Sequence, residues 1–264
     1  MKRAYADTPE GQIHYRIDGS GEPVIFLHMA CSSSDEYTEV MRFMSDSYRC
    51  IAMDFPGYGD SDKPTYKYQI GDYARTVAEF MDALYIKRAS IVGHHVGATI
   101  GAEFAANFPD RVDKLILSAY EYFRDENKWI ALQRDPVFKP IEIDPEGSHL
   151  MEYWRRAKRY GDPVEIVARR ALDFHKAGPG GEQMHSALHH AYGPKIKATL
   201  PRIQCPTLLL WGALDPFCKE PEDSKNLIPR SKLTIIPNGP VYIDRVMPKQ
   251  FAEAIVAFLE NPGV

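Results

Sequence analysis

The segment Val92–Ala98, "VGHHVGA", lies between two sequence patterns with different periods. The apolar residues 89–91 before it are typical of a short buried strand, and residues 99–107, "TIGAEFAAN", have the spacing of a helix. Within the segment, two glycines flank one central residue, His95. A strand, a Gly-x-X-x-Gly turn and a helix predict a sharp, strained elbow, from which the side chain of His95 projects above a sheet.

Short apolar runs recur on both sides of this elbow, and stretches with helical spacing separate them. The runs are "PVIFLHM", "YRCIAMDF", "ASIVGHH", "DKLILSAY", "PTLLLWG" and "SKLTIIP". Because they are apolar on both faces and alternate with helices, they predict an α/β fold with a mainly parallel sheet covered on both sides. Two early segments, "AYADTP" and "QIHYRIDG", alternate with a period of two, which predicts an antiparallel hairpin at one edge.

The alternation of strands and helices stops in the middle of the chain. Residues 123–198 are charged, aromatic and mostly helical in pattern, and they contain no run typical of a strand. We therefore predict a core domain formed by residues 1–122 and 199–264. Residues 123–198 are predicted to form a helical cap domain over the ends of the strands.

Composition and charge restrict the partners that the protein can have. The chain of 264 residues is 44% apolar and 26% charged, its net charge is −4, and it has no run rich in lysine or arginine. These features argue against nucleic acid and against a membrane surface, and they favour a small-molecule substrate. No segment resembles a signal peptide or a membrane span, so we expect a cytoplasmic protein. A homodimer is left open.

We expect no metal and no cofactor. His185 and His189 are spaced so that they could share one face of a helix. They lack both an HExxH pattern and a neighbouring cysteine, so a polar helix face is the simpler interpretation.

Five motifs in register with the elbow resemble the α/β-hydrolase superfamily over nearly the whole chain. "VIFLHMACSSS" resembles the strand and loop that carry the family's oxyanion-hole residue, and "MDFPGYGDSDKP" resembles its Asp-x-x-Gly-x-Gly-x-Ser turn. "VGHHVGA" stands at the nucleophile elbow, "CPTLLLWGALD" at the strand before the triad acid, and "PKQFAEAIVAFLEN" at the closing helix. The resemblance implies an eight-stranded, mainly parallel sheet with an inserted helical cap.

Two positions depart from the pattern of the superfamily. His95 stands where the family has its nucleophilic serine, and Val241 stands where the catalytic histidine follows the last strand. The last histidine in the chain is His190, so no shift of the alignment supplies another one. The Ser-His-Asp relay, in which histidine deprotonates serine, is therefore not available.

The resemblance also implies which parts of the catalytic site are retained. Asp215 matches the triad acid, although an Asp-Pro pair is equally typical of a turn. Glu121 occupies an alternative acid position after the preceding strand, and could instead be a solvent-facing hinge residue. The backbone N–H groups of Ala30 and Val96 match the two donors of the oxyanion hole. Met29 replaces the glycine that usually precedes the first donor.

We interpret His95 as a general base, oriented by Asp215 or Glu121. A carboxylate partner fixes the tautomer of an imidazole and raises its basicity. Such a base could activate water against an ester, a lactone or another carbonyl compound. It could equally start an elimination, a decarboxylation or a carbon–carbon cleavage. A catalytically silent hydrolase that only binds a ligand is the third interpretation, because two triad residues are replaced together.

Aromatic residues in or beside the inserted segment suit a small, partly apolar substrate. Packing of the cap onto the core would explain many of the same residues. The predicted substrate contacts are Met29, His94, Tyr120, Tyr122, Trp129, Trp154, Phe217, Val241 and Tyr242.

Overall fold

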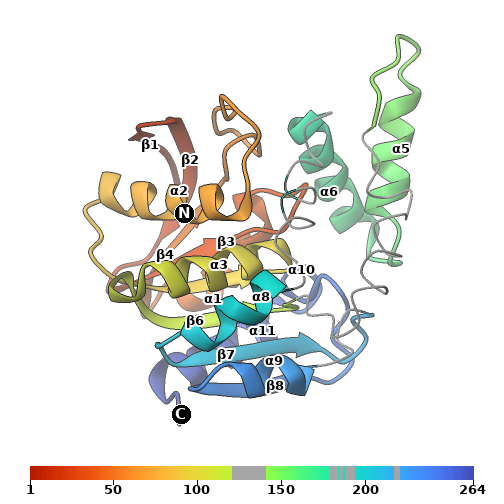
Figure 1. Cartoon of the computed structure of the whole chain (residues 1–264). Coiled ribbons are helices and arrows are strands. Elements are labelled where there is room, and N and C mark those ends of the chain that lie inside the picture. The colour runs from red at the N-terminus through yellow and green to blue at the C-terminus, as the bar shows by residue number, and fades with distance from the viewer. Residues whose placement is uncertain (121–140, 179–183, 185–186, 188–193, 217–220) are drawn as a thin grey trace.

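A computed structural model of the chain describes residues 1–120, 141–178, 184, 187, 194–216 and 221–264. Within these residues, eight strands form a single sheet in the order β1-β2-β4-β3-β5-β6-β7-β8 (Figure 1). The strands are β1 (Lys2–Thr8), β2 (Gly11–Asp18), β3 (Glu22–Leu27), β4 (Tyr48–Met53), β5 (Ala89–His94), β6 (Val112–Ser118), β7 (Thr207–Gly212) and β8 (Ser231–Ile236).

The pairing of the strands confirms the predicted α/β sheet. β1 pairs with β2 in antiparallel register, and β2 pairs with β4 in the same sense, so the predicted edge hairpin is present. All other neighbours, from β4 and β3 through to β7 and β8, run parallel. The carboxyl ends of these parallel strands therefore lie along one edge of the sheet.

Helices cover the sheet on both faces, as the doubly apolar strands predict. In β3, Ile25 and Leu27 belong to a core cluster with α2 (Ile70–Ala83) and α3 (Val96–Asn107). The alternate residues Val24 and Phe26 belong to a second cluster with α1 (Thr38–Met44) and α11 (Pro248–Glu260). Successive side chains of a strand point to opposite faces, so one apolar run fills both cores.

The described helices also include α5 (Ser148–Ala157), α6 (Val164–Ala177), α8 (Pro194–Thr199), α9 (Pro221–Leu227) and α10 (Ile243–Val246). Short 3-10 helices lie at η1 (Ser34–Tyr37), η2 (Pro109–Arg111) and η5 (Leu200–Arg202). In the part of the chain described, no helix combines the length and the apolar character that a membrane crossing requires.

Two helices of the predicted cap, α5 and α6, follow β6 in the chain and lie together at one side of the molecule (Figure 1). Tyr153 of α5 and Phe174 of α6 share a small buried cluster with Cys31, which belongs to the loop after β3. The hydroxyl of Ser33 in the same loop donates a hydrogen bond of 2.7 Å to Asp173 of α6. The division of the chain into a core and a cap at residues 123 and 198 stays a prediction.

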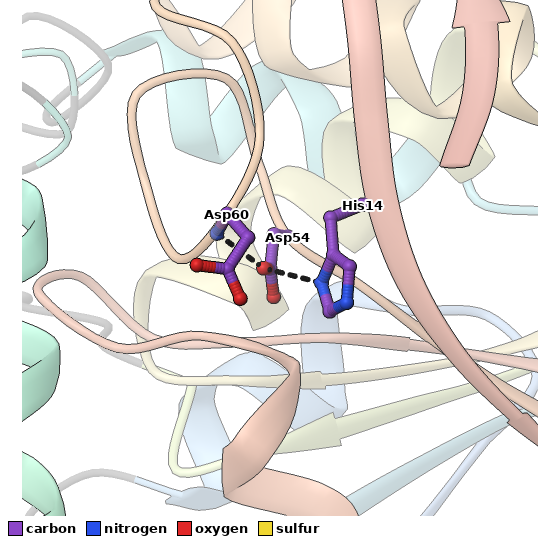
Figure 2. Close-up of side chains that lie close together, drawn as sticks. All are labelled: His14, Asp54 and Asp60. Atoms are coloured by element: carbon purple, nitrogen blue, oxygen red, sulfur yellow. Dashed lines mark hydrogen bonds and ion pairs between the residues drawn. The ribbon is translucent and has the colours of Figure 1, made fainter. Parts of the chain in front are cut away.

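A buried hydrogen-bonded pair, His14 and Asp54, fixes the turn that follows β4. Nδ1 of His14 lies 2.8 Å from Oδ2 of Asp54, and the same oxygen accepts the backbone N–H of Asp60 at 2.8 Å (Figure 2). The other oxygen of Asp54 accepts the backbone N–H of Ser34. One carboxylate thus joins β2, the turn after β4 and the loop after β3. Such a group stabilises the fold only while it is ionised.

The close approach of α3 to β3 leads to a first prediction, for Gly97. A Cβ at this position would overlap the backbone carbonyl oxygens of Leu27 and His28, which cannot move aside as a flexible side chain can. Gly97→Ala should therefore lower the free energy of unfolding by about 3 kcal/mol, as measured by urea denaturation. Gly71 in α2 is the matched control, because a Cβ there meets no atom within 4 Å. Gly71→Ala should leave the protein equally stable or slightly more stable. Equal effects of the two changes would contradict the close packing of the elbow.

The buried pair leads to a second prediction, for Asp54. Burial by itself would raise the pKa of Asp54, but the hydrogen bond from His14 and the nearby His28 ring lower it to about 2. Since the folded-state pKa is depressed, the carboxylate stabilises the protein above the ordinary pKa of aspartate, and this contribution is lost as the pH falls towards 2. Asp54→Asn should cost about 2 kcal/mol at neutral pH, and less at pH values near 3.

The measurement is chemical denaturation of the wild-type protein and the Asp54→Asn variant across this acidic range. Asp110→Asn serves as a control, because Asp110 is exposed to solvent. A loss of stability that does not change with pH would show that the charge of Asp54 is not what holds the turn.

Candidate active site

His95 occupies the strained turn between β5 and α3. Its backbone angles are φ 49° and ψ −117°, a region that residues other than glycine rarely adopt and that costs about 1–3 kcal/mol. The backbone N–H of His95 donates to the carbonyl of Ser118 in β6 at 2.9 Å. Its own carbonyl accepts the N–H groups of Ala98 and Thr99 at 2.9 and 3.2 Å. The surrounding hydrogen bonds therefore hold the conformation that the sequence predicts.

Asp215 is the carboxylate that the described structure brings to His95. It lies in the turn after β7, and its Oδ2 is 3.7 Å from Nε2 of His95. Both residues are buried, with 2% and 5% of their surface exposed. The distance is within the range of an ion pair but longer than a hydrogen bond. Contacts of this kind often tighten when substrate binds. Glu121, the alternative acid, lies outside the described residues.

His94, beside His95, is fixed by protein atoms at both ring nitrogens. Nε2 lies 3.1 Å from the carbonyl oxygen of Val241, and Nδ1 lies 3.0 Å from the hydroxyl oxygen of Ser118. A carbonyl can only accept, so Nε2 carries the hydrogen and Nδ1 accepts from the hydroxyl. Burial holds the pKa of His94 well below its ordinary value, so the ring is neutral. Its predicted role in substrate binding stays a prediction.

The loop that follows β3 carries the first predicted oxyanion donor, Ala30, which is buried. On one side, the backbone N–H of Met29 donates to Oε2 of Glu36 at 3.2 Å. On the other, Nδ1 of His28 donates to the carbonyl of Met29 at 2.7 Å, while Nε2 of His28 accepts the N–H of Phe55. Burial lowers the pKa of His28 to about 4, which keeps the ring neutral for both bonds. Two side chains thus determine the position of the loop.

The second predicted donor, Val96, is the first residue of α3 and is buried. The N–H groups in the first turn of a helix have no hydrogen-bond acceptor within the helix. The helix dipole also places a partial positive charge at this end. This position suits an N–H that stabilises a developing oxyanion.

A buried arginine joins the loop after β3 to α6. Nη2 of Arg245, in α10, donates to Oδ2 of Asp173 at 2.8 Å and to the hydroxyl of Ser32 at 3.0 Å. Its Nη1 lies 3.6 Å from Oδ2 of Asp35, which also accepts a 2.8 Å hydrogen bond from Arg169 of α6. Sequence reasoning missed this network and missed Glu36, because no motif links residues from such distant segments.

The remaining predicted contacts fall into two groups. Tyr120, Val241 and Tyr242 are buried, Met29 and Trp154 are half-buried, and all five belong to the described part of the chain. The guanidinium of Arg170, in α6, lies over the ring of Tyr242, 3.6 Å from its centre. The other predicted contacts, Tyr122, Trp129 and Phe217, lie outside the described residues, as do His185 and His189.

Two clusters in the described structure have the residue types of a metal site. In His14, Asp54 and Asp60, the oxygens of Asp54 and Nδ1 of His14 are already used in the hydrogen bonds of the turn (Figure 2). In the second cluster, Glu36, His94 and Asp244, the hydrogen on Nε2 of His94 points to the carbonyl of Val241. Neither cluster therefore presents a complete set of ligand atoms.

Comparisons with known proteins agree with this architecture. Over 277 aligned residues, the chain is 26% identical to haloalkane dehalogenase 2 of Mycobacterium tuberculosis (strain ATCC 25618 / H37Rv), with 95% of this chain and 92% of that protein covered. It is 32% identical over 121 residues to the cis-3-alkyl-4-alkyloxetan-2-one decarboxylase of Shewanella oneidensis, which covers 44% of this chain and 38% of that protein. Among solved structures, the enol-lactonase from Burkholderia xenovorans LB400 superposes with a TM-score of 0.81 at 20% identity, over 98% of this chain and all of that one.

The model of one protein family, described as the alpha/beta hydrolase fold, matches residues 22–240. This match includes the loop after β3, the elbow at His95 and the turn that carries Asp215. Together with the eight-stranded sheet, it covers most of the chain. The protein therefore belongs to the alpha/beta hydrolase fold family.

Proposed function

We propose that this protein is an enzyme in which His95 acts as a general base, with Asp215 as its orienting partner. The substrate of the proposal is a small, partly apolar carbonyl compound, ester or lactone. The observation that carries the proposal is the buried contact of 3.7 Å between Nε2 of His95 and Oδ2 of Asp215, at the strained elbow of the fold.

The position of Asp215 suggests which ring nitrogen does the chemistry. A carboxylate accepts hydrogen bonds, so the imidazole hydrogen belongs on Nε2, facing Asp215. Nδ1 then carries the lone pair that accepts a proton. The charge of Asp215 also stabilises the imidazolium that forms during the reaction.

In this proposal, His95 and Val241 stand where other members of the family have their serine and histidine. The nucleophile is then a water molecule. Nδ1 takes a proton from this water while its oxygen attacks the substrate carbonyl. The N–H groups of Ala30 and Val96 stabilise the resulting oxyanion. As the tetrahedral intermediate collapses, the leaving group takes the proton back from the imidazolium.

A lyase or decarboxylase reaction is the second candidate. The same base could remove a proton from the substrate itself, and the bond that then breaks would be a carbon–carbon bond. The partial similarity to an oxetanone decarboxylase favours this alternative. A silent ligand-binding protein is the third candidate, in which His95 only fills the elbow.

Substrate contacts are proposed for the residues that the sequence predicts to line the site. They comprise Met29, His94, Tyr120, Tyr122, Trp129, Trp154, Phe217, Val241 and Tyr242. Glu121 remains the alternative partner of His95 in the proposal.

The third prediction concerns the loss of the base. His95→Ala should lower kcat/KM by at least about 100-fold, because general-base catalysis contributes that much or more. The assay is a turnover screen over esters, lactones, β-keto acids and cyanohydrins, with the wild-type protein and the variant run in parallel. His175→Ala in α6 removes an exposed histidine and should leave the rate unchanged.

Water labelled with oxygen-18 separates the candidate reactions. Hydrolysis incorporates the label into the acid product, whereas decarboxylation and carbon–carbon cleavage do not require it. Full activity in His95→Ala would remove His95 from the mechanism. No turnover by the wild-type protein on any substrate class, together with saturable ligand binding, would favour the silent protein.

The fourth prediction concerns the residues that the serine mechanism requires. His95→Ser alone should not hydrolyse esters, because Val241 cannot deprotonate the new hydroxyl. In the double variant with Val241→His, a serine, a histidine and Asp215 would occupy the three positions of the relay. We expect it to release p-nitrophenol from short-chain esters in a burst, with an acyl-enzyme visible by mass spectrometry. Strong esterase activity in the single variant would show that another group already serves as the base.

A further inference from the structure

Two buried carboxyl groups lie beside His94, outside the proposed contact between His95 and Asp215. Glu36 belongs to η1 and Asp244 to α10, and their exposed fractions are 2% and 1%. Ligand-type atoms of these two residues and of His94 all lie within 4.8 Å of one another. The three segments are far apart in the sequence and meet at the carboxyl edge of the sheet.

The oxygens of these two groups have few hydrogen-bond donors around them. Oε2 of Glu36 accepts the backbone N–H of Met29, and the hydroxyl of Ser32 also acts as a donor to this carboxyl group. Its Oε1 has no hydrogen bond within the described structure. The same is true of both oxygens of Asp244, although Oδ1 lies 3.5 Å from Nε2 of His94. Buried carboxylates with free lone pairs are costly, because the charge is removed from water without compensation.

The charged groups around the pair do not neutralise two carboxylates. Arg245 acts on both groups, and its guanidinium already contacts Asp173 and Asp35. Arg170 acts more weakly on Asp244, and its Nη1 lies 3.7 Å from Oδ2 of Asp162. His95 is the other basic group that acts on Asp244. His94 is neutral, because burial lowers its pKa and both ring nitrogens are engaged. The other titratable group beside Glu36 is the phenol of Tyr37, whose pKa burial raises further above its ordinary value. One proton on the carboxyl pair would remove the excess negative charge.

We propose that Glu36 and Asp244 share one proton at neutral pH, and that the protonated pair holds the loop of Met29 and Ala30 in its catalytic position. Glu36 is then a positioning residue, which acts through the backbone N–H of Met29. The part of this inference that concerns catalysis rests on the proposed function, whereas the shared proton does not.

The electrostatics of the site agree with this assignment. Burial, and then the charge of Asp244, raise the pKa of Glu36 to about 8. Burial also raises the pKa of Asp244, against the opposing effect of Arg245. Glu36 is therefore the group on which the proton resides for most of the time. Because the two groups interact strongly, their titrations belong to the pair.

A divalent cation would also neutralise the pair. It would need Nε2 of His94 as its third ligand atom, and this nitrogen carries the hydrogen that it donates to the carbonyl of Val241. The geometry therefore favours the proton, and metal analysis of the purified protein tests the alternative.

The direct experiment is infrared difference spectroscopy, which needs no substrate. The wild-type protein at neutral pH should show the carbonyl band of a buried protonated carboxylic acid, and this band should shift in heavy water. The band should disappear in Glu36→Gln and titrate at lower pH in Asp244→Asn. Glu39→Gln is the matched control, because Glu39 lies at the surface, where it contacts Arg42, and the band should be unchanged.

Stability gives a second readout that is independent of activity. Since the pKa of Glu36 is raised in the folded state, the native protein binds more protons than the unfolded chain between about pH 4.5 and pH 8. Compared with Glu36→Gln, the unfolding constant of the wild-type protein should therefore rise with pH across this window, by up to about tenfold per pH unit. Parallel pH profiles of the two proteins would contradict the proposal.

The positioning role is tested by two substitutions at Glu36 in an assay of turnover. Glu36→Gln keeps an oxygen that can accept the N–H of Met29, and it should retain kcat and extend activity to higher pH. Glu36→Leu removes the acceptor and should lower kcat by at least about 10-fold, with folding checked by circular dichroism.

The outcomes separate this inference from the proposed function. Absence of the protonated band at neutral pH, or one equivalent of metal that is lost in Asp244→Asn, would overturn the shared proton. Equal kcat values for Gln and Leu at position 36 would overturn the positioning role. A band that behaves as expected in a protein whose His95→Ala variant is fully active would overturn only the proposed function.

Discussion

The strained turn at His95 is the constraint on which the rest of the site depends. Its positive φ is maintained because the backbone of α3 packs directly against the end of β3. Only a glycine at position 97 permits this close approach of the two backbones. Hydrogen bonds to Ser118 and from the first turn of α3 fix the remaining freedom of the turn. The side chain of His95 therefore projects in one direction, towards the turn that carries Asp215, and the helix N-terminus lies beside it.

Positive φ angles at residues other than glycine gather at the same edge of the sheet. Four of the five in the described residues lie there, His95, Cys31 after β3, Ala119 after β6 and Asn238 after β8, and the fifth, Tyr85, follows α2. At each of these four positions the chain turns sharply after a parallel strand. In open α/β sheets this carboxyl edge is where ligands bind, and strain is concentrated where a fold positions functional groups. The free-energy cost of this strain is offset by the burial of the two apolar cores, one on each face of the sheet.

Buried charges connect the elements around this edge. Asp54 joins β2 to the loops after β3 and β4, and Arg245 joins the loop after β3 to α6. Both groups are buried, so their charges are stabilised by protein partners instead of water. Each group therefore fixes the relative position of the segments that it contacts. A change of one partner leaves the other buried without compensation, which is why such networks act as a unit. Both groups contact the segment that follows Met29 and Ala30, Arg245 at Ser32 and Asp54 at Ser34.

The sequence by itself determined the sheet, the edge hairpin, the helix after the elbow and the presence of a histidine at its centre. These features follow from local rules, because the period of apolar residues reports which face is buried, and paired glycines report where two backbones must come close. Resemblance to a family added Asp215. Only the tertiary structure decided that Nε2 of His95 faces this carboxylate, that His94 is neutral and engaged, and that Glu36 contacts the N–H of Met29. The physical reason is that polar contacts form between segments that meet only after the sheet is assembled, and a pattern along the chain contains no record of which groups then face each other.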